Sequence, residues 1–264
     1  MDSSSNWLFI DPPLTATRTD NAIPRLTVTH YSFGSPDGLG VSLSGDVERI
    51  HYIFGLVNGN EDNFNVSSNN KKVSVGGNLA VDIFDSAIGT HSDLAYSETP
   101  KMTANIGFNY QGKRVDSDKN DAGVEQLSGA TINRILTGSA GLQYRFKGFS
   151  INAESYARRT AFANRGSASA VVVPNLNLDD LGYYITSGYF IVPKKLESAA
   201  GWSYIRRSGP DNDSYELGGS LNYYLRGRNL KLTLQYTRST FYADIIGSRN
   251  KNVNKVMLGV NALF

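Results

Sequence analysis

The last residues of the chain alternate between apolar side chains and side chains that are mostly small or polar. One set of positions holds Val256, Leu258, Val260, Ala262 and Phe264, and the positions between them hold Met257, Gly259, Asn261 and Leu263. Successive side chains of a β-strand point to opposite faces, so this period of two predicts a strand with one wholly apolar face. The strands of outer-membrane barrels need such a pattern, because their outward residues meet lipid and their inward residues meet water.

Ten further segments alternate in the same way. Their apolar positions fall within residues 39–43, 50–56, 73–83, 102–110, 140–146, 149–157, 183–191, 196–204, 215–225 and 230–236. Most of these predicted strands are about nine to twelve residues long, as tilted membrane strands are. Residues 1–36 contain Pro12, Pro13 and Pro24 and are irregular, with room for one short strand at Arg25 to His30. The pattern therefore predicts eleven strands and offers a twelfth.

The connections between these strands differ in length. Tight turns are predicted near residues 46, 147, 193 and 227, and long polar connections near 58–71, 112–135, 159–181, 207–214 and 239–252. Counting back from the last strand places the long connections at one end and the turns at the other, with Asp85 to Pro100 as the exception. Outer-membrane barrels have this asymmetry, with short periplasmic turns and long outer loops.

These patterns predict an all-β fold in which residues 37–264 form an antiparallel transmembrane β-barrel, with about 12 strands visible. The structural alternative is a soluble β-sandwich, whose strands also alternate. The exposed face of a sandwich usually carries more Lys, Glu and Thr, whereas the non-apolar faces here are rich in Gly, Ser and Asn.

Composition supports strands over helices. The 264 residues include 26 Gly, 15 Tyr and 12 Phe but 8 Pro and no Cys, which excludes disulfides and thiol chemistry. No stretch approaches the roughly 18 continuous apolar residues of a membrane helix. The formal net charge of +2 argues against nucleic acid as the main partner. Met1 to Ser5 lack the basic and apolar regions of a signal peptide, so an exported form would be mature, cut or recombinant.

The sequence favours a protein that is not an enzyme. His30, His51 and His91 are scattered, and neither a metalloprotease motif nor a serine-nucleophile elbow nor a phosphate loop is present. We therefore expect no cofactor and no metal. The turn Asp211 to Asp213 could supply oxygen ligands to calcium, but such a turn needs no ion. A set of aromatic residues fits the interfacial girdles of a membrane protein, with a sugar-stacking surface as the alternative: Tyr183, Tyr189, Trp202, Tyr223 and Tyr236.

The alternation also predicts which charged residues face the interior. The basic set is Arg145, Arg158, Arg207, Arg226 and Lys231, and it is opposed by Asp82, Glu154, Glu197 and Glu216. Guanidinium groups bind phosphate through a planar fork, and a pore lined by bases concentrates anions. One interpretation is an anion path. The other is that these bases and acids pair across strands, as in any water-filled barrel.

One hairpin resembles a known family. Leu181 to Arg206 contains G-Y-F-I-V-P-K-K-L-E, which is similar to a hairpin of the phosphate-selective porin O and P family, and Gly38 to Asn60 and Gly218 to Thr237 resemble other hairpins of that family. The resemblance implies a sixteen-stranded, homotrimeric porin of the bacterial outer membrane that passes small anions such as phosphate. Since eleven or twelve strands are visible, the chain enters this pattern part way along, as a fragment or a shortened relative.

The resemblance also implies partners. They are the lipid bilayer with its lipopolysaccharide, and the assembly machinery of the outer membrane, for which Phe264 would be the terminal aromatic signal. The alternative function is a barrel that does not conduct and serves as a scaffold, an adhesin or a sleeve for a partner protein.

Overall fold

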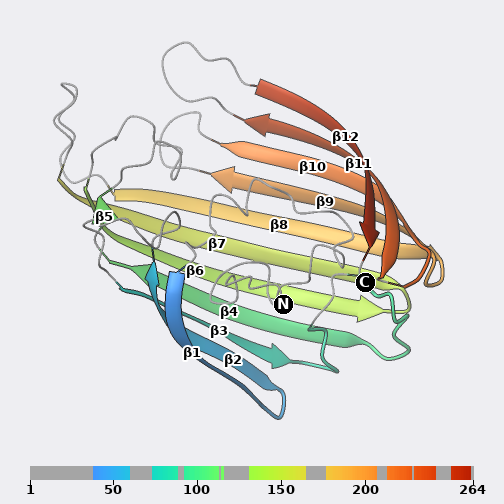
Figure 1. Ribbon diagram of the computed structural model, residues 1–264, viewed down its shortest axis with the longest axis horizontal. Helices are drawn as coiled ribbons and strands as arrows, with labels where there is room; N and C mark the ends of the chain where they lie inside the picture. The colour runs from blue at the N-terminus through green and yellow to red at the C-terminus, as the bar shows by residue number, and fades with distance from the viewer. Residues whose placement is uncertain are drawn as a thin grey trace.

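A single antiparallel β-sheet makes up the computed structural model, which describes residues 38–59, 73–88, 92–112, 114–115, 131–164, 177–206, 213–227, 229–241 and 251–262 (Figure 1). The strands are β1 (Gly38–Val47), β2 (Ile50–Gly59), β3 (Val73–Asp82), β4 (Lys101–Gln111), β5 (Arg114–Val115), β6 (Thr131–Phe146), β7 (Phe149–Asn164), β8 (Asn177–Val192), β9 (Leu196–Arg206), β10 (Ser214–Tyr224), β11 (Leu230–Phe241) and β12 (Lys251–Ala262). No helix in this part of the chain is long and apolar enough to cross a membrane.

Each long strand pairs with the next one along the chain. The order is β1-β2-β3-β4-β6-β7-β8-β9-β10-β11-β12, and the two residues of β5 pair with the start of β6. The eleven strands predicted from alternation are therefore confirmed as eleven long strands of one antiparallel sheet. In a meander of this kind each strand pairs with its neighbour in the sequence, so a local pattern of alternation was enough to find the strands and their order.

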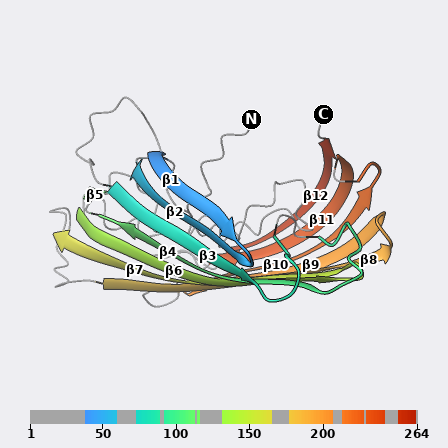
Figure 2. The same ribbon diagram turned by 90° about the horizontal axis from the view of Figure 1, so that it is seen from below.

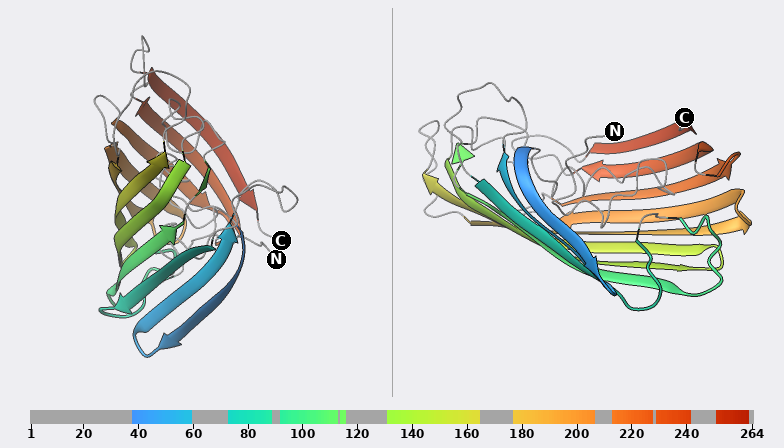
Figure 3. Two further views of the ribbon diagram at one scale, coloured as in Figure 1. Left: turned by 90° about the vertical axis from the view of Figure 1, so that its left-hand side faces the viewer. Right: turned by 60° about the horizontal axis from the view of Figure 1, so that its bottom comes forward.

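The sheet curls into a trough and is not closed into a barrel (Figures 2 and 3). β1 and β12 form its two rims. Because the path between them contains an odd number of long strands, β1 and β12 run in the same direction. Antiparallel closure would need at least one more strand that runs the opposite way. Arg25 to His30, the predicted twelfth strand, lies outside the described residues.

Connections of different length lie at the two ends of the sheet. At one end, called the turn end, are residues 48–49, 147–148, 193–195 and 225–229, together with the longer β3–β4 connection, residues 83–100. At the other, called the loop end, β2–β3, β4–β6, β7–β8, β9–β10 and β11–β12 are joined by 60–72, 112–130, 165–176, 207–213 and 242–250. The predicted asymmetry is present, including its one exception.

Several predicted strand boundaries were wrong. β6 begins at Thr131, β7 continues to Asn164 and β8 begins at Asn177, so the connection predicted at 159–181 is partly strand. Pairing continues there although the apolar alternation has ended, and a register irregularity near Ile132 interrupts the pattern at the start of β6. The turn predicted near residue 46 lies at residues 48–49, because β1 runs to Val47.

Candidate functional site

The two faces of the sheet have the reverse of the polarity expected in water. Along β9 and β10 the buried positions alternate with more exposed ones. Glu197, Ser203 and Asn222 are fully buried, whereas Trp202 and Leu217 on the other side are 39% and 54% exposed. We call the side of the buried polar residues the inner face and the other side the outward face.

Large apolar side chains cover the outward face. Leu258 is 79% exposed. Leu234, directly opposite it, and Leu221, directly opposite Leu234 on the next strand, are 49% and 46% exposed. All the long strands other than β7 contribute such a residue, for example Val41, Phe54, Leu79, Ile106, Leu136, Ile185, Trp202, Leu217, Leu232 and Val260. Soluble monomers rarely expose contiguous apolar patches of more than a few hundred Å². Larger exposed apolar patches are typical of surfaces that contact another protein or a membrane.

The predicted basic residues fall into three groups. Arg145, Arg158 and Lys231 lie on the inner face, from β6, β7 and β11. Arg226 lies in the exposed turn between β10 and β11 rather than on that face, because β10 ends at Tyr224. Arg207 lies outside the described residues, and so does Phe264, the predicted assembly signal.

Arg158 forms an ion pair across neighbouring strands of the inner face. It lies directly opposite Asp180, and its Nη2 and Nε donate to Asp180 Oδ2 over 2.6 and 3.1 Å. The side chains are 10% and 6% exposed. A pair held by two hydrogen bonds in this little-exposed position fixes the register of β7 and β8 and neutralises its own charge.

A buried acid connects three elements of the inner face. Glu197 Oε2 accepts hydrogen bonds from Tyr224 OH at 2.8 Å, Asn222 Nδ2 at 3.1 Å and Ser92 Oγ at 3.1 Å. Glu197 and Asn222 lie directly opposite each other in β9 and β10, whereas Ser92 belongs to the β3–β4 connection. Glu197 therefore joins this connection to strands that follow it by about a hundred residues in the chain.

Lys231 lies next to this network and is fully buried. It faces Tyr224 directly across β10 and β11, with its Nζ 5.7 Å from the centre of the tyrosine ring. An ammonium group over an aromatic face is a stabilising cation–π arrangement. One of the predicted bases is thus packed into the inner wall near the turn end.

The β3–β4 connection is fastened at several points. Asp93 accepts from Ser97 Oγ at 2.6 Å and from the Gly148 backbone N–H at 2.7 Å, and Lys147 N–H donates to the Ser97 carbonyl at 2.9 Å. Gly148 has a φ of +80°, and a Cβ there would lie 2.5 Å from Tyr96. Only glycine satisfies both conditions. The connection thus crosses from β3–β4 to the β6–β7 turn and to β9–β10.

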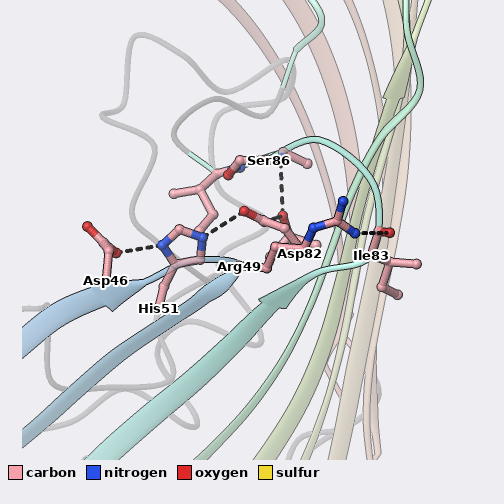
Figure 4. A network of polar contacts seen from close by, with 9 residues as sticks. Asp46, Arg49, His51, Asp82, Ile83 and Ser86 are labelled. Atoms are coloured by element: carbon pink, nitrogen blue, oxygen red, sulfur yellow. Dashed lines mark hydrogen bonds and ion pairs between the residues drawn. The ribbon is translucent and has the colours of Figure 1, made fainter.

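A histidine lies between two carboxylates near the turn end of β1, β2 and β3 (Figure 4). His51 Nδ1 is 2.5 Å from Asp46 Oδ1, and its Nε2 is 2.7 Å from Asp82 Oδ2. An ionised carboxylate only accepts hydrogen bonds, so the imidazole is the donor in each contact that it makes with an ionised acid. Thr103 Oγ1 also donates to Asp82, at 2.5 Å. Arg49, also drawn in Figure 4, lies in the β1–β2 turn.

Within the described ranges no group of three or more His, Cys, Asp or Glu side chains could hold a metal ion.

Aromatic residues predicted for a girdle do lie on the outward face: Tyr183, Tyr189, Trp202, Tyr223 and Tyr236 are each at least one-third exposed. Tyr183 packs against Trp202 and Tyr204 with ring centres 5.0 and 5.3 Å apart.

Sequence reasoning missed the β3–β4 connection as part of the site. It identified Glu197 as an inner acid but not as the residue that holds Ser92. The one available signal was the length of Asp85 to Pro100 at an end where every other connection is short. Its partners are distant in the sequence, so no local pattern could have named them.

Comparison of the chain with protein-family models, with curated proteins and with solved structures found no significant match. The resemblance to the phosphate-selective porins therefore stays a prediction.

Proposed function

We propose that this chain spans the bacterial outer membrane as a β-barrel and acts as a porin, a passive diffusion channel for small anions such as phosphate. The inverted polarity of the sheet carries this proposal. An exposed apolar face costs about 25 cal/mol per Å² in water, but none of this cost arises where the neighbour is lipid. Polar side chains on the opposite face suit a water-containing interior. Turns at one end and long connections at the other fit a periplasmic and an outer side.

The anion part of the proposal rests on the inner bases. Arg145, Lys231 and Arg158 lie on that face, together with acids such as Asp180 and Glu197. Because the Arg158 guanidinium is paired with Asp180 and Lys231 is fully buried in the wall, the contribution of these two residues to an anion path is small. We therefore expect weak rather than strict anion preference, set by the balance of the remaining charges.

Planar-bilayer recording tests this function. Folded protein is expected to give stepwise, ohmic currents whose reversal potential in a salt gradient shows modest anion preference. An R145Q variant is expected to shift the reversal potential in the direction of cation preference. The control substitution T240V, which changes no charge, is expected to leave the reversal potential unchanged. Ohmic currents with cation preference would refute the anion claim but not the channel.

A second candidate is a barrel that does not conduct and holds a partner or a plug. The observation that favours it is the fully buried set Glu197, Asn222 and Lys231, which shows that the inner face is covered at the turn end of β9–β11. Efficient insertion into bilayers without any conductance would support this candidate over the porin.

Closure can be tested separately, because the chain contains no Cys. Val41 on β1 and Val260 on β12 point outward and are 70% and 65% exposed. If one further strand lies between them, they are separated by two inter-strand spacings, or about 10 Å. A V41C/V260C variant in vesicles is then expected to be cross-linked within one chain by a bis-maleimide of roughly that length. Cross-linking only between chains would contradict closure of a single chain.

A further inference from the structure

The charged residues of the outward face are not scattered. Among described strand residues whose side chains lie on that face, the charged ones are Arg134, Arg159, Asp179, Arg206 and Arg238. All five lie in the half of their strand nearest the loop end. The outward face thus carries an apolar band with arginines along one margin of it.

Four of these residues form a continuous group across β6, β7, β8 and β9. Arg159 lies directly opposite Asp179, and its Nε and Nη2 donate to the two carboxylate oxygens over 2.7 and 2.9 Å. Arg134 is two residues from the position opposite Arg159, and Arg206 is two residues from the position opposite Asp179 on the other side. Such diagonal neighbours are about 7–8 Å apart.

The charge of this arginine group is positive and accessible. Three guanidinium groups and one carboxylate sum to +3 − 1 = +2. Arg159 and Asp179 are 57% and 56% exposed, and Arg134 and Arg206 are exposed as well. The carboxylate of Asp179 pairs with the central arginine, Arg159, and the exposed residues Arg134 and Arg206 lie on the strands to either side of this pair.

The surface directly beside the group is mainly apolar and aromatic, and it includes the hydroxyl of Tyr204, which donates to Asp213 Oδ2 at 2.6 Å. Leu136 lies opposite Arg159, Leu181 lies opposite Arg206, and the packed rings of Tyr183, Trp202 and Tyr204 adjoin them. Leu136 and Leu181 are 50% and 51% exposed. A ligand of this surface must therefore combine anionic groups with a long apolar part.

From this arrangement we propose a binding site for a membrane lipid that carries more than one phosphate group and several acyl chains. Its phosphates lie between the guanidinium forks of Arg134, Arg159 and Arg206, which suit tetrahedral oxyanions. Its acyl chains lie along Leu136, Leu181 and the aromatic cluster. The site rests on the proposed membrane function and specifies which lipid, on which strands and at which end.

Native mass spectrometry of the folded protein in detergent tests this site, with diphosphorylated, hexa-acylated lipid A as the probe. The wild-type protein is expected to retain the probe. An R134Q/R206Q variant is expected to bind the probe at least about tenfold more weakly, which is the scale expected for lost charge-assisted hydrogen bonds. The control K194Q/K195Q removes two exposed charges from the β8–β9 turn at the other end and should bind like wild type.

Three comparisons make the outcome decisive. Equal binding by R134Q/R206Q and wild type, or an equal loss in K194Q/K195Q, would overturn the site, the latter by showing unspecific attraction. Displacement by millimolar inorganic phosphate would also overturn it, because the site would then be one for free phosphate.

If the wild type inserts and conducts in phosphatidylcholine vesicles but shows no preference for the probe, only the lipid site fails. If it neither inserts nor conducts, the proposed function fails.

Discussion

Two neighbouring ion pairs show how differently the two faces of this sheet are built. Arg158–Asp180 and Arg159–Asp179 are consecutive in the same register of β7 and β8, and both have nitrogen–oxygen distances of 2.6 to 3.1 Å. The side chains of the first are 10% and 6% exposed, and those of the second 57% and 56%. The same chemistry thus occurs once within a polar wall and once on an apolar surface.

The environment of an ion pair, rather than its residue types, determines its role in this sheet. On the inner face an ion pair holds strands together and satisfies buried groups. On the outward face the same pair leaves charge available for a ligand, because it lies at the margin of the apolar band. The same substitution made on the inner face and on the outward face should therefore have different effects.

The largest effect is expected from a charge in the middle of the outward face. L234K places an ammonium group where Leu221 and Leu258 flank it, and should reduce the free energy of unfolding from vesicles by about 2–4 kcal/mol if lipid lies there. The matched control L225K makes the same change at the turn end and should cost at most about 1 kcal/mol. Urea titration in vesicles measures both. Equal tolerance of the two changes would indicate that water, not lipid, covers this face.

A somewhat smaller effect is expected on the inner face. R158M leaves Asp180 without its paired guanidinium in a position that is 6% exposed. Loss of hydrogen bonds to a charged group costs about 1.5–3 kcal/mol, so the unfolding midpoint should fall clearly. A variant as stable as wild type would show that the pair contributes nothing to the wall.

The β3–β4 connection is expected to respond to a single hydroxyl. S92A removes the donor to Glu197 and the acceptor for Tyr224, at a cost of about 1 kcal/mol. Because the strands stay intact, the main result should be faster protease cleavage within residues 83–100, with little change in the unfolding midpoint. Unchanged cleavage would mean that Asp93 and Gly148 hold the connection without Ser92.

The smallest effect is expected from the outward ion pair. R159M removes a group exposed to solvent or headgroups, where ion pairs contribute little to stability. We expect an unfolding midpoint indistinguishable from that of wild type under conditions in which R158M is clearly destabilised. A loss as large as that of R158M would erase the difference between the two faces.

Much of the fold could be predicted because the alternation is strict and one-sided. A period of two fixes the face of every residue once one is assigned, which is why Arg145, Arg158 and Lys231 were placed on the inner face from sequence. The strand ends were harder. Beyond the apolar band both faces are polar, so consecutive charges such as Arg158 and Arg159 resemble a loop although the backbone remains paired.

The rest of the site could not be predicted because it depends on contacts between distant segments. Ser92 meets Glu197 across about a hundred residues, and Lys231 is buried by its surroundings rather than by its strand pattern. The arginine group on the outward face arises from the register of four strands, which alternation alone does not give. Closure of the sheet likewise depends on what lies between β1 and β12.

Spin labels along β11 test the central claim most directly, since each can be attached to a single introduced Cys in a chain that has none. Labels at 232, 234 and 236 lie on the outward face, and labels at 233 and 235 lie on the inner face. In lipid vesicles the three outward labels are expected to collide often with oxygen and rarely with a water-soluble nickel complex, with a period of two along the strand. Ready access of the nickel complex to the labels at 232, 234 and 236 would contradict a membrane-spanning sheet.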